Sequence, residues 1–94
     1  MQFMVLSRRR TEDFQETDFE AVLPEEGEKV RTLYAAGIVR QAWLRGDSGG
    51  ACFLVEAEDE TDARGIVRSL PLAVRGLSEF TVIPLLPYRG FGPR

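Results

Sequence analysis

Glu26 combines a residue type and a spacing that suit proton transfer. It lies four positions before Val30, and residues at this spacing share one side of an α-helix. A helix over this region would therefore place the carboxyl group of Glu26 on the apolar stripe that faces a sheet. Partial burial there raises the pKa of a carboxyl group and suits it to accept and return a proton. The alternative is an exposed acid that complements the positive end of the helix dipole, and the spacing leaves both open.

Tyr34, Arg40, Gln41 and Trp43 are the candidate substrate-binding residues. Arg40 can hold a carboxylate through two hydrogen bonds or stabilise an enolate, unless it forms a salt bridge with the acidic segment of another subunit. Gln41 can bind a carbonyl group but does not shuttle protons at neutral pH. Tyr34 and Trp43 each offer an apolar wall with a polar tip, although aromatic residues at such spacing also serve as ordinary core.

The absence of histidine excludes much familiar chemistry. The chain has no histidine and one cysteine, so it has no imidazole base, no Ser-His-Asp triad and no Cys-His pair. Cys52 lies in an apolar run without a neighbouring cation, and we expect it to serve packing in a reducing compartment. The GDSGG string of residues 46–50 matches the surroundings of a protease nucleophile, but without histidine we interpret it as a hairpin turn.

The elements that position these residues follow the order strand, helix, strand, strand, helix, strand. The expected strands are residues 2–7, 38–45, 51–55 and 80–86, and the expected helices run from Pro24 to Gly37 and from Asp59 to Pro71. Proline at the start and glycine at the end bound the first helix, and Asp59 is a suitable N-cap for the second. The order predicts a single α+β domain, residues 1–94, with a ferredoxin-like βαββαβ topology. Its four-stranded antiparallel sheet carries two helices on one face.

The second strand predicts a partner for the other face of that sheet. Its alternation sets Val39, Gln41 and Trp43 against Ile38, Arg40, Ala42 and Leu44, so both faces are partly apolar. Helices on one face leave the second exposed. We therefore expect a homo-oligomer. The tail of residues 87–94, rich in proline, glycine and arginine, is expected to pack on a neighbouring subunit.

Charge and hydropathy indicate where the protein works. With 94 residues, a net charge of −3 and a pI of about 4.9, the chain lacks the cationic surplus that binds nucleic acid or anionic membranes. No apolar run approaches the length of a membrane span or a secretory core. We expect a cytoplasmic protein. The run Arg8 to Arg10 is interpreted as a solvated cluster facing the acidic stretch of residues 12–28.

Two strings, GIVRQAW at residues 37–43 and SLPL at residues 69–72, resemble segments of the muconolactone isomerase family within the dimeric α/β-barrel superfamily. Length and element order agree over about residues 2–86. The resemblance implies an oligomer, a dimer or a ring of dimers such as a decamer, that shifts a proton in an unsaturated lactone without metal or organic cofactor. It implies that Glu26 matches the family's acid, and Arg40 and Trp43 its arginine and tryptophan. Gln41 stands where the family usually has histidine, and Gly27 where it has lysine.

The leading hypothesis is a cofactor-independent isomerase in which Glu26 shuttles the proton. Arg40 and Gln41 bind oxygen atoms, and Tyr34 and Trp43 shape the cavity. One alternative is a non-catalytic module for small-molecule binding or assembly on the same oligomeric barrel. Another is a cofactor-free oxygenase or cyclase for aromatic polyketide-like substrates. A closed, water-lined cavity that touches Glu26 favours catalysis, whereas a packed interior with Glu26 in bulk solvent favours the module.

Overall fold

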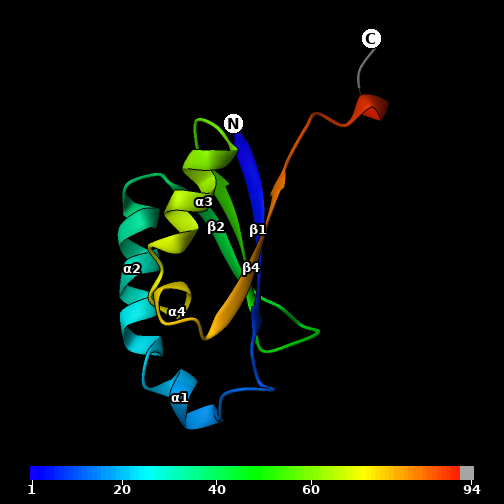
Figure 1. Ribbon diagram of the computed structural model, residues 1–94. Coiled ribbons are helices and arrows are strands. Elements are labelled where there is room, and N and C mark those ends of the chain that lie inside the picture. The colour runs from blue at the N-terminus through cyan, green and yellow to red at the C-terminus, as the bar shows by residue number, and fades with distance from the viewer. Residues whose placement is uncertain (92–94) are drawn as a thin grey trace.

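The alternating apolar residues of the chain build a four-stranded antiparallel sheet (Figure 1). In the computed structural model, which describes residues 1–91, the strands are β1 (Gln2–Arg9), β2 (Val39–Leu44), β3 (Ala51–Glu56) and β4 (Ser78–Pro84). Their order across the sheet is β2-β3-β1-β4, with every neighbouring pair antiparallel. This α+β architecture, confirmed as predicted, is compatible with a ferredoxin-like fold.

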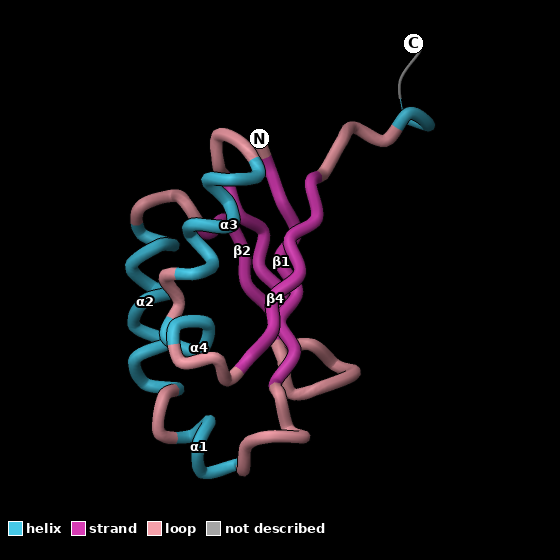
Figure 2. The backbone as a smooth tube through the Cα atoms, viewed as in Figure 1, coloured by secondary structure: helices cyan, strands magenta, loops and turns pink. Residues whose placement is uncertain are grey.

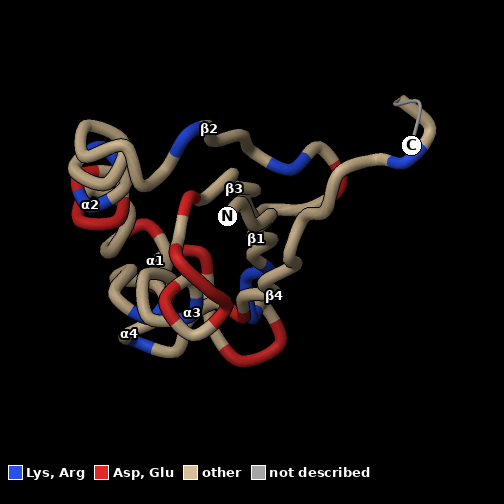
Figure 3. Tube along the Cα trace, turned by 90° about the horizontal axis from the view of Figure 1, so that it is seen from above, with Lys and Arg blue, Asp and Glu red and all other residues tan. Residues whose placement is uncertain are grey.

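The helices gather on one side of the sheet, as Figures 2 and 3 show. They are α1 (Glu16–Glu20), α2 (Leu23–Ala35), α3 (Glu60–Arg68) and α4 (Pro71–Val74), followed by a 3-10 turn at Arg89–Phe91. The two longer ones, α2 and α3, are the predicted helices. The second helix was expected to end at Pro71, but α3 ends at Arg68 and Pro71 begins the separate helix α4, because proline is tolerated in the first turn of a helix.

Local signals fix the helix ends. Pro24 lies in the first turn of α2, and Gly37 just beyond its end has a φ of 78°, the left-handed conformation that glycine adopts without strain. The carboxylate of Asp59 accepts the backbone N–H of Asp62 at 2.8 Å and so caps α3. These end signals agree with the expectations from sequence.

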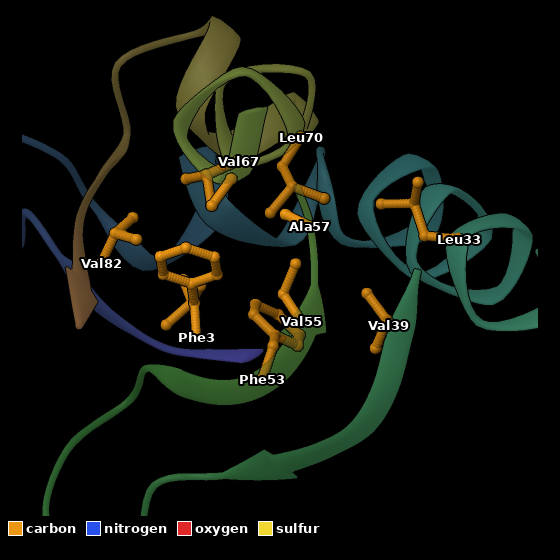
Figure 4. Close-up of a cluster of buried hydrophobic side chains, with 11 residues drawn as sticks. Phe3, Leu33, Val39, Phe53, Val55, Ala57, Val67, Leu70 and Val82 are labelled. Carbon is orange, nitrogen blue, oxygen red and sulfur yellow. The ribbon is translucent and has the colours of Figure 1, made fainter. Parts of the chain in front are cut away.

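The main core lies between the sheet and helices α2 and α3. Figure 4 shows Phe3, Phe53 and Val82 directed from the strands toward Val67 of α3. A smaller cluster, made of Phe19, Val22, Leu72 and Leu77, joins α1 and α4 to the end of the sheet. Phe3 and Phe19 are almost fully buried. The two clusters hold α2 over the sheet and so fix the position of Glu26.

A β-bulge in β2 changes which of its side chains share a face. The expectation that Val39, Gln41 and Trp43 share one face is wrong. Val39 pairs with Val55, but the next paired residue, Gln41, lies opposite Leu54, because Arg40 is an extra residue in the ladder. Val39 is therefore buried under the helices, whereas Gln41 and Trp43 lie on the opposite face.

That opposite face of the sheet is not covered by any helix of residues 1–91 (Figure 3). It carries the apolar side chains of Met4, Leu6, Trp43, Leu54 and Ile83, alternating with the core-facing residues of the same strands. None of the helices in the described part of the chain could span a membrane. After β4 the chain runs away from the sheet (Figure 1), with Leu86 79% and Phe91 89% exposed. The last positions of the expected tail, residues 92–94, lie outside the described residues.

Candidate functional site

A pocket of about 230 Å³ lies between the sheet and the first half of α2. Its floor comes from the end of β1, the start of β3 and the start of β4, and its walls come from α2, α4 and the hairpin turn. The lining residues are Ser7, Arg9, Leu23, Glu26, Gly27, Val30, Leu44, Gly49, Gly50, Ala51, Phe53, Leu72 and Ser78. The volume is below the roughly 300–1,000 Å³ of pockets for drug-sized ligands, so the pocket suits a smaller, single-ring compound.

Glu26 contributes the carboxyl group of this pocket. It is 8% exposed and lies on the sheet-facing side of α2, as its spacing from Val30 predicts. Its Oε1 atom accepts the backbone N–H of Leu72 at 2.9 Å. Burial raises the pKa of Glu26 above its ordinary value of 4.5, and the hydrogen bond from Leu72 partly offsets this rise. The group can therefore hold a proton at a higher pH than an exposed glutamate does.

This shift predicts a pH dependence of stability. Because the pKa of Glu26 is raised in the folded state, the stability linked to its proton is present below the unfolded-state pKa of 4.5 and is lost as pH rises through the folded-state pKa. The loss is at most about 1.4 kcal/mol for each pH unit of that window. Glu26→Gln should therefore gain free energy of unfolding relative to the wild type between pH 4 and 7. Urea denaturation at several pH values measures this difference, and a constant difference would contradict the raised pKa.

The other polar groups of the pocket come from β1 and β4. The hydroxyl oxygen of Ser7 accepts the backbone N–H of Ala51 at 2.8 Å. Ser78 is 7% exposed, and within the described residues its hydroxyl has no hydrogen-bond partner. Arg9 pairs with Ser78 across the two strands, so their side chains lie on the same face of the sheet. The pocket is otherwise apolar.

The three arginines at the end of β1 differ in their contacts. Arg8 forms ion pairs with Glu12 at 2.9 Å and Glu79 at 3.0 Å, and Arg10 pairs with Asp13. These contacts confirm the expected cluster facing the acidic stretch. The strand β1 continues past residue 7 because Arg8 and Arg9 pair with Glu79 and Ser78 of β4. Arg9 lies 3.7 Å from Glu16 of the acidic stretch, and it also lines the pocket.

The structure does not bring the remaining candidate residues to the pocket of Glu26. Tyr34 is 60% exposed on α2. Arg40 lies 3.9 Å from Glu56, and both belong to the uncovered side of the sheet. Gln41 and Trp43 lie on that same side, where Trp43 pairs with the half-buried Cys52. Within one chain, the geometry therefore joins Glu26 to none of these four candidate residues.

Arg9 and Ser78 are the pocket residues that sequence reasoning missed. Phe3, Val5 and Ser7 are buried on alternate positions of β1, and the same alternation places Arg9 on the core side. The sequence signal existed, but it required a strand extended into the arginine run. For Ser78 no sequence signal distinguishes a pocket position from an ordinary loop serine.

Comparison with known proteins assigns no family. No protein-family model matches the chain, and no curated protein matches its sequence. Across residues 1–91, no group of three or more Cys, Asp or Glu side chains is placed to hold a metal ion.

Proposed function

We propose that this protein is a cofactor-independent enzyme of the muconolactone isomerase type, which shifts a proton in a small unsaturated lactone or related carbonyl compound. The observation that supports this most is the buried carboxyl group of Glu26 in the wall of a pocket of about 230 Å³. Such a group, with a raised pKa and an apolar enclosure, has the properties of a general base.

The contacts of Glu26 suit one reaction in particular. The Leu72 N–H holds Oε1, and among the described residues no hydrogen bond engages Oε2, so Oε2 is free to act on a substrate. Oε2 takes a proton from the γ-carbon of an α,β-unsaturated lactone, and the electron pair moves through the conjugated system to the carbonyl oxygen as a dienolate. The same carboxyl group returns the proton at the carbon next to the carbonyl. No atom is gained or lost, so the shift requires no co-reactant.

Proton NMR in D₂O tests this function with the wild-type protein. A panel of five-membered unsaturated lactones, including muconolactone, is incubated with the enzyme in the presence of a chelator. We expect deuterium to enter the carbon positions on either side of the migrating double bond faster than in buffer alone. No enzyme-dependent exchange across the panel would contradict the proposal, and oxygen uptake with phenols would favour an oxygenase instead.

The hydrogen bond between Leu72 and Glu26 also favours a second candidate function. A buried carboxylate that satisfies a backbone N–H has a structural use, which fits a non-catalytic module for small-molecule binding or assembly. The two functions differ in one measurable respect. The module binds a lactone of the panel without solvent exchange at its carbon atoms, whereas the enzyme catalyses that exchange.

We further propose that a second copy of the chain covers the open face of the sheet, giving the dimeric barrel that the family resemblance implies. The apolar row of Leu6, Leu54 and Trp43 on that face supports the proposal, since an apolar sheet face exposed to water is unfavourable. The exposed apolar side chains of Leu86 and Phe91 suit packing on a neighbouring subunit as well.

Substitution of Leu54 by glutamate tests the dimer. An unpaired charge at a buried interface costs about 3 kcal/mol or more, which corresponds to an affinity weakened about 100-fold or more. Sedimentation velocity should show a dimer or larger ring for the wild type and a monomer for Leu54→Glu. The matched control, Thr32→Glu on the exposed side of α2, should behave as the wild type. A monomeric wild type at all concentrations would contradict the proposal.

A further inference from the structure

We propose that Arg9 and Ser78 form an anion-binding subsite in the pocket of Glu26, which holds the acidic oxygen group of a small ring compound. The subsite rests on the proposed function for its use in catalysis, because it would orient the substrate toward Glu26. The binding itself depends only on the contacts of Arg9 and Ser78. Three observations on these two residues carry the proposal.

The first observation is that Arg9 lacks the partners that its neighbours have. Arg8 makes two hydrogen bonds to Glu12, at 2.9 and 3.0 Å. Arg10 bonds to Asp13 and donates to the carbonyl oxygen of Gly76 at 2.8 Å. The guanidinium of Arg9 donates no hydrogen bond to any residue of the part of the chain that the structure describes.

The nearby carboxylate of Glu16 does not satisfy the N–H donors of Arg9. The Nη1 atom of Arg9 lies 3.7 Å from Oε1 of Glu16, which is longer than a hydrogen bond. The Glu16 side chain is 70% exposed, whereas that of Arg9 is only 20% exposed. A guanidinium carries five N–H donors, and most of the Arg9 side chain is shielded from water. A bound anion would satisfy donors that the protein leaves unpaired.

The second observation is that Arg9 is held in place before any ligand binds. Its guanidinium carbon lies 5.3 Å from the ring centre of Phe19, a cation–π contact with an almost fully buried ring. A Cβ atom at Gly49 would lie 3.2 Å from Cδ of Arg9, so the hairpin turn also packs closely along the side chain. A pre-oriented guanidinium loses little freedom on binding.

The third observation is the unpaired hydroxyl of Ser78. Ser78 lines the same pocket and lies directly across the strand pair from Arg9. Its buried hydroxyl has no partner in residues 1–91, and buried polar groups in native structures are normally paired. An oxygen acceptor that reaches both residues would receive hydrogen bonds from the guanidinium and from the hydroxyl.

The apolar lining of the pocket indicates which kind of compound bears the anionic group. Val30, Phe53 and Leu72 form an apolar wall, which suits a hydrocarbon ring. The arginine that sequence reasoning assigned to substrate binding, Arg40, lies on the opposite face beside Glu56. Within one chain, Arg9 is the cation that lines this pocket. The expected ligand is therefore a small cyclic organic acid.

Isothermal titration calorimetry with 2-furoate and 2-furamide tests the subsite, because the two probes have nearly the same shape and differ in charge. We expect the acid to bind the wild type at least tenfold more tightly than the amide. Arg9→Gln should weaken binding of the acid at least tenfold and leave binding of the amide unchanged. Ser78→Ala should weaken binding of the acid several-fold.

The control variant is Arg8→Gln, which removes an adjacent arginine whose partners lie outside the pocket. It should bind the acid as the wild type does. Equal affinities for acid and amide, no binding of either, or equal losses in Arg8→Gln and Arg9→Gln would overturn the subsite. Glu26→Gln separates the two proposals, since it should keep acid binding while losing proton exchange. Acid binding that depends on Arg9 without any lactone exchange would overturn the proposed function alone.

Discussion

Glu26→Gln should lower the rate of lactone proton exchange by about 10²–10⁴-fold, the contribution typical of a general base. Glutamine keeps a carbonyl oxygen that can accept the Leu72 N–H, now made to Glu26 at 2.9 Å, but it cannot take up a proton. The fold should therefore remain, and the Tm should not fall. Initial exchange rates by NMR and a thermal melt of the same sample measure both quantities.

The neighbouring residue offers a matched control. Glu25 has the same side chain, but it is exposed and pairs with Arg75 at 3.0 Å, an ion pair of little energetic weight. Glu25→Gln should leave both the exchange rate and the Tm near those of the wild type. If Glu26→Gln retained the wild-type rate, the carboxyl group would have no part in the chemistry.

Gly50→Ala should destabilise the fold by about 3 kcal/mol. A Cβ atom at Gly50 would lie 1.9 Å from the backbone oxygen of Ser7, so β1 and β3 must move apart at the floor of the pocket. A loss of this size lowers the Tm of a domain of this length by roughly 12–24 °C. Differential scanning calorimetry measures the shift.

Gly46 in the same hairpin turn serves as the comparison. A Cβ atom there would have no neighbour within 4 Å, so Gly46→Ala should change stability by less than about 0.5 kcal/mol. Equal stability of the two variants would show that the close approach of Gly50 to β1 is not needed. Within the GDSGG string, Gly50 therefore serves close packing against β1, whereas Gly46 belongs to the open part of the turn.

The strength of local signals decided which parts of the fold could be predicted. Gly37 and Asp59 each act through their own backbone or a neighbouring N–H, so their roles follow from residue type alone. The bulge at Arg40 depends on the register between β2 and β3. A register is a property of two strands, and a single residue type does not reveal it.

The residues of the candidate site also differ in how far the sequence reveals their positions. The inward position of Glu26 follows from its helical spacing to Val30, because both lie on one regular helix. The place of Arg9 follows from the pairing of β1 with β4, which outweighs the tendency of an arginine run to end a strand. The pocket volume depends on how Phe53, Leu72 and the glycines of the turn pack together, and no sequence pattern encodes it.

A carbon-13 NMR titration of the Glu26 carboxyl group, assigned by its loss in Glu26→Gln, tests the central claim most directly. The claim is that this carboxyl group is buried, holds its proton to higher pH than usual, and faces a guest in the pocket. We predict a pKa above 4.5 that moves when a lactone of the panel is added. A pKa at or below 4.5 that no lactone changes would contradict the account.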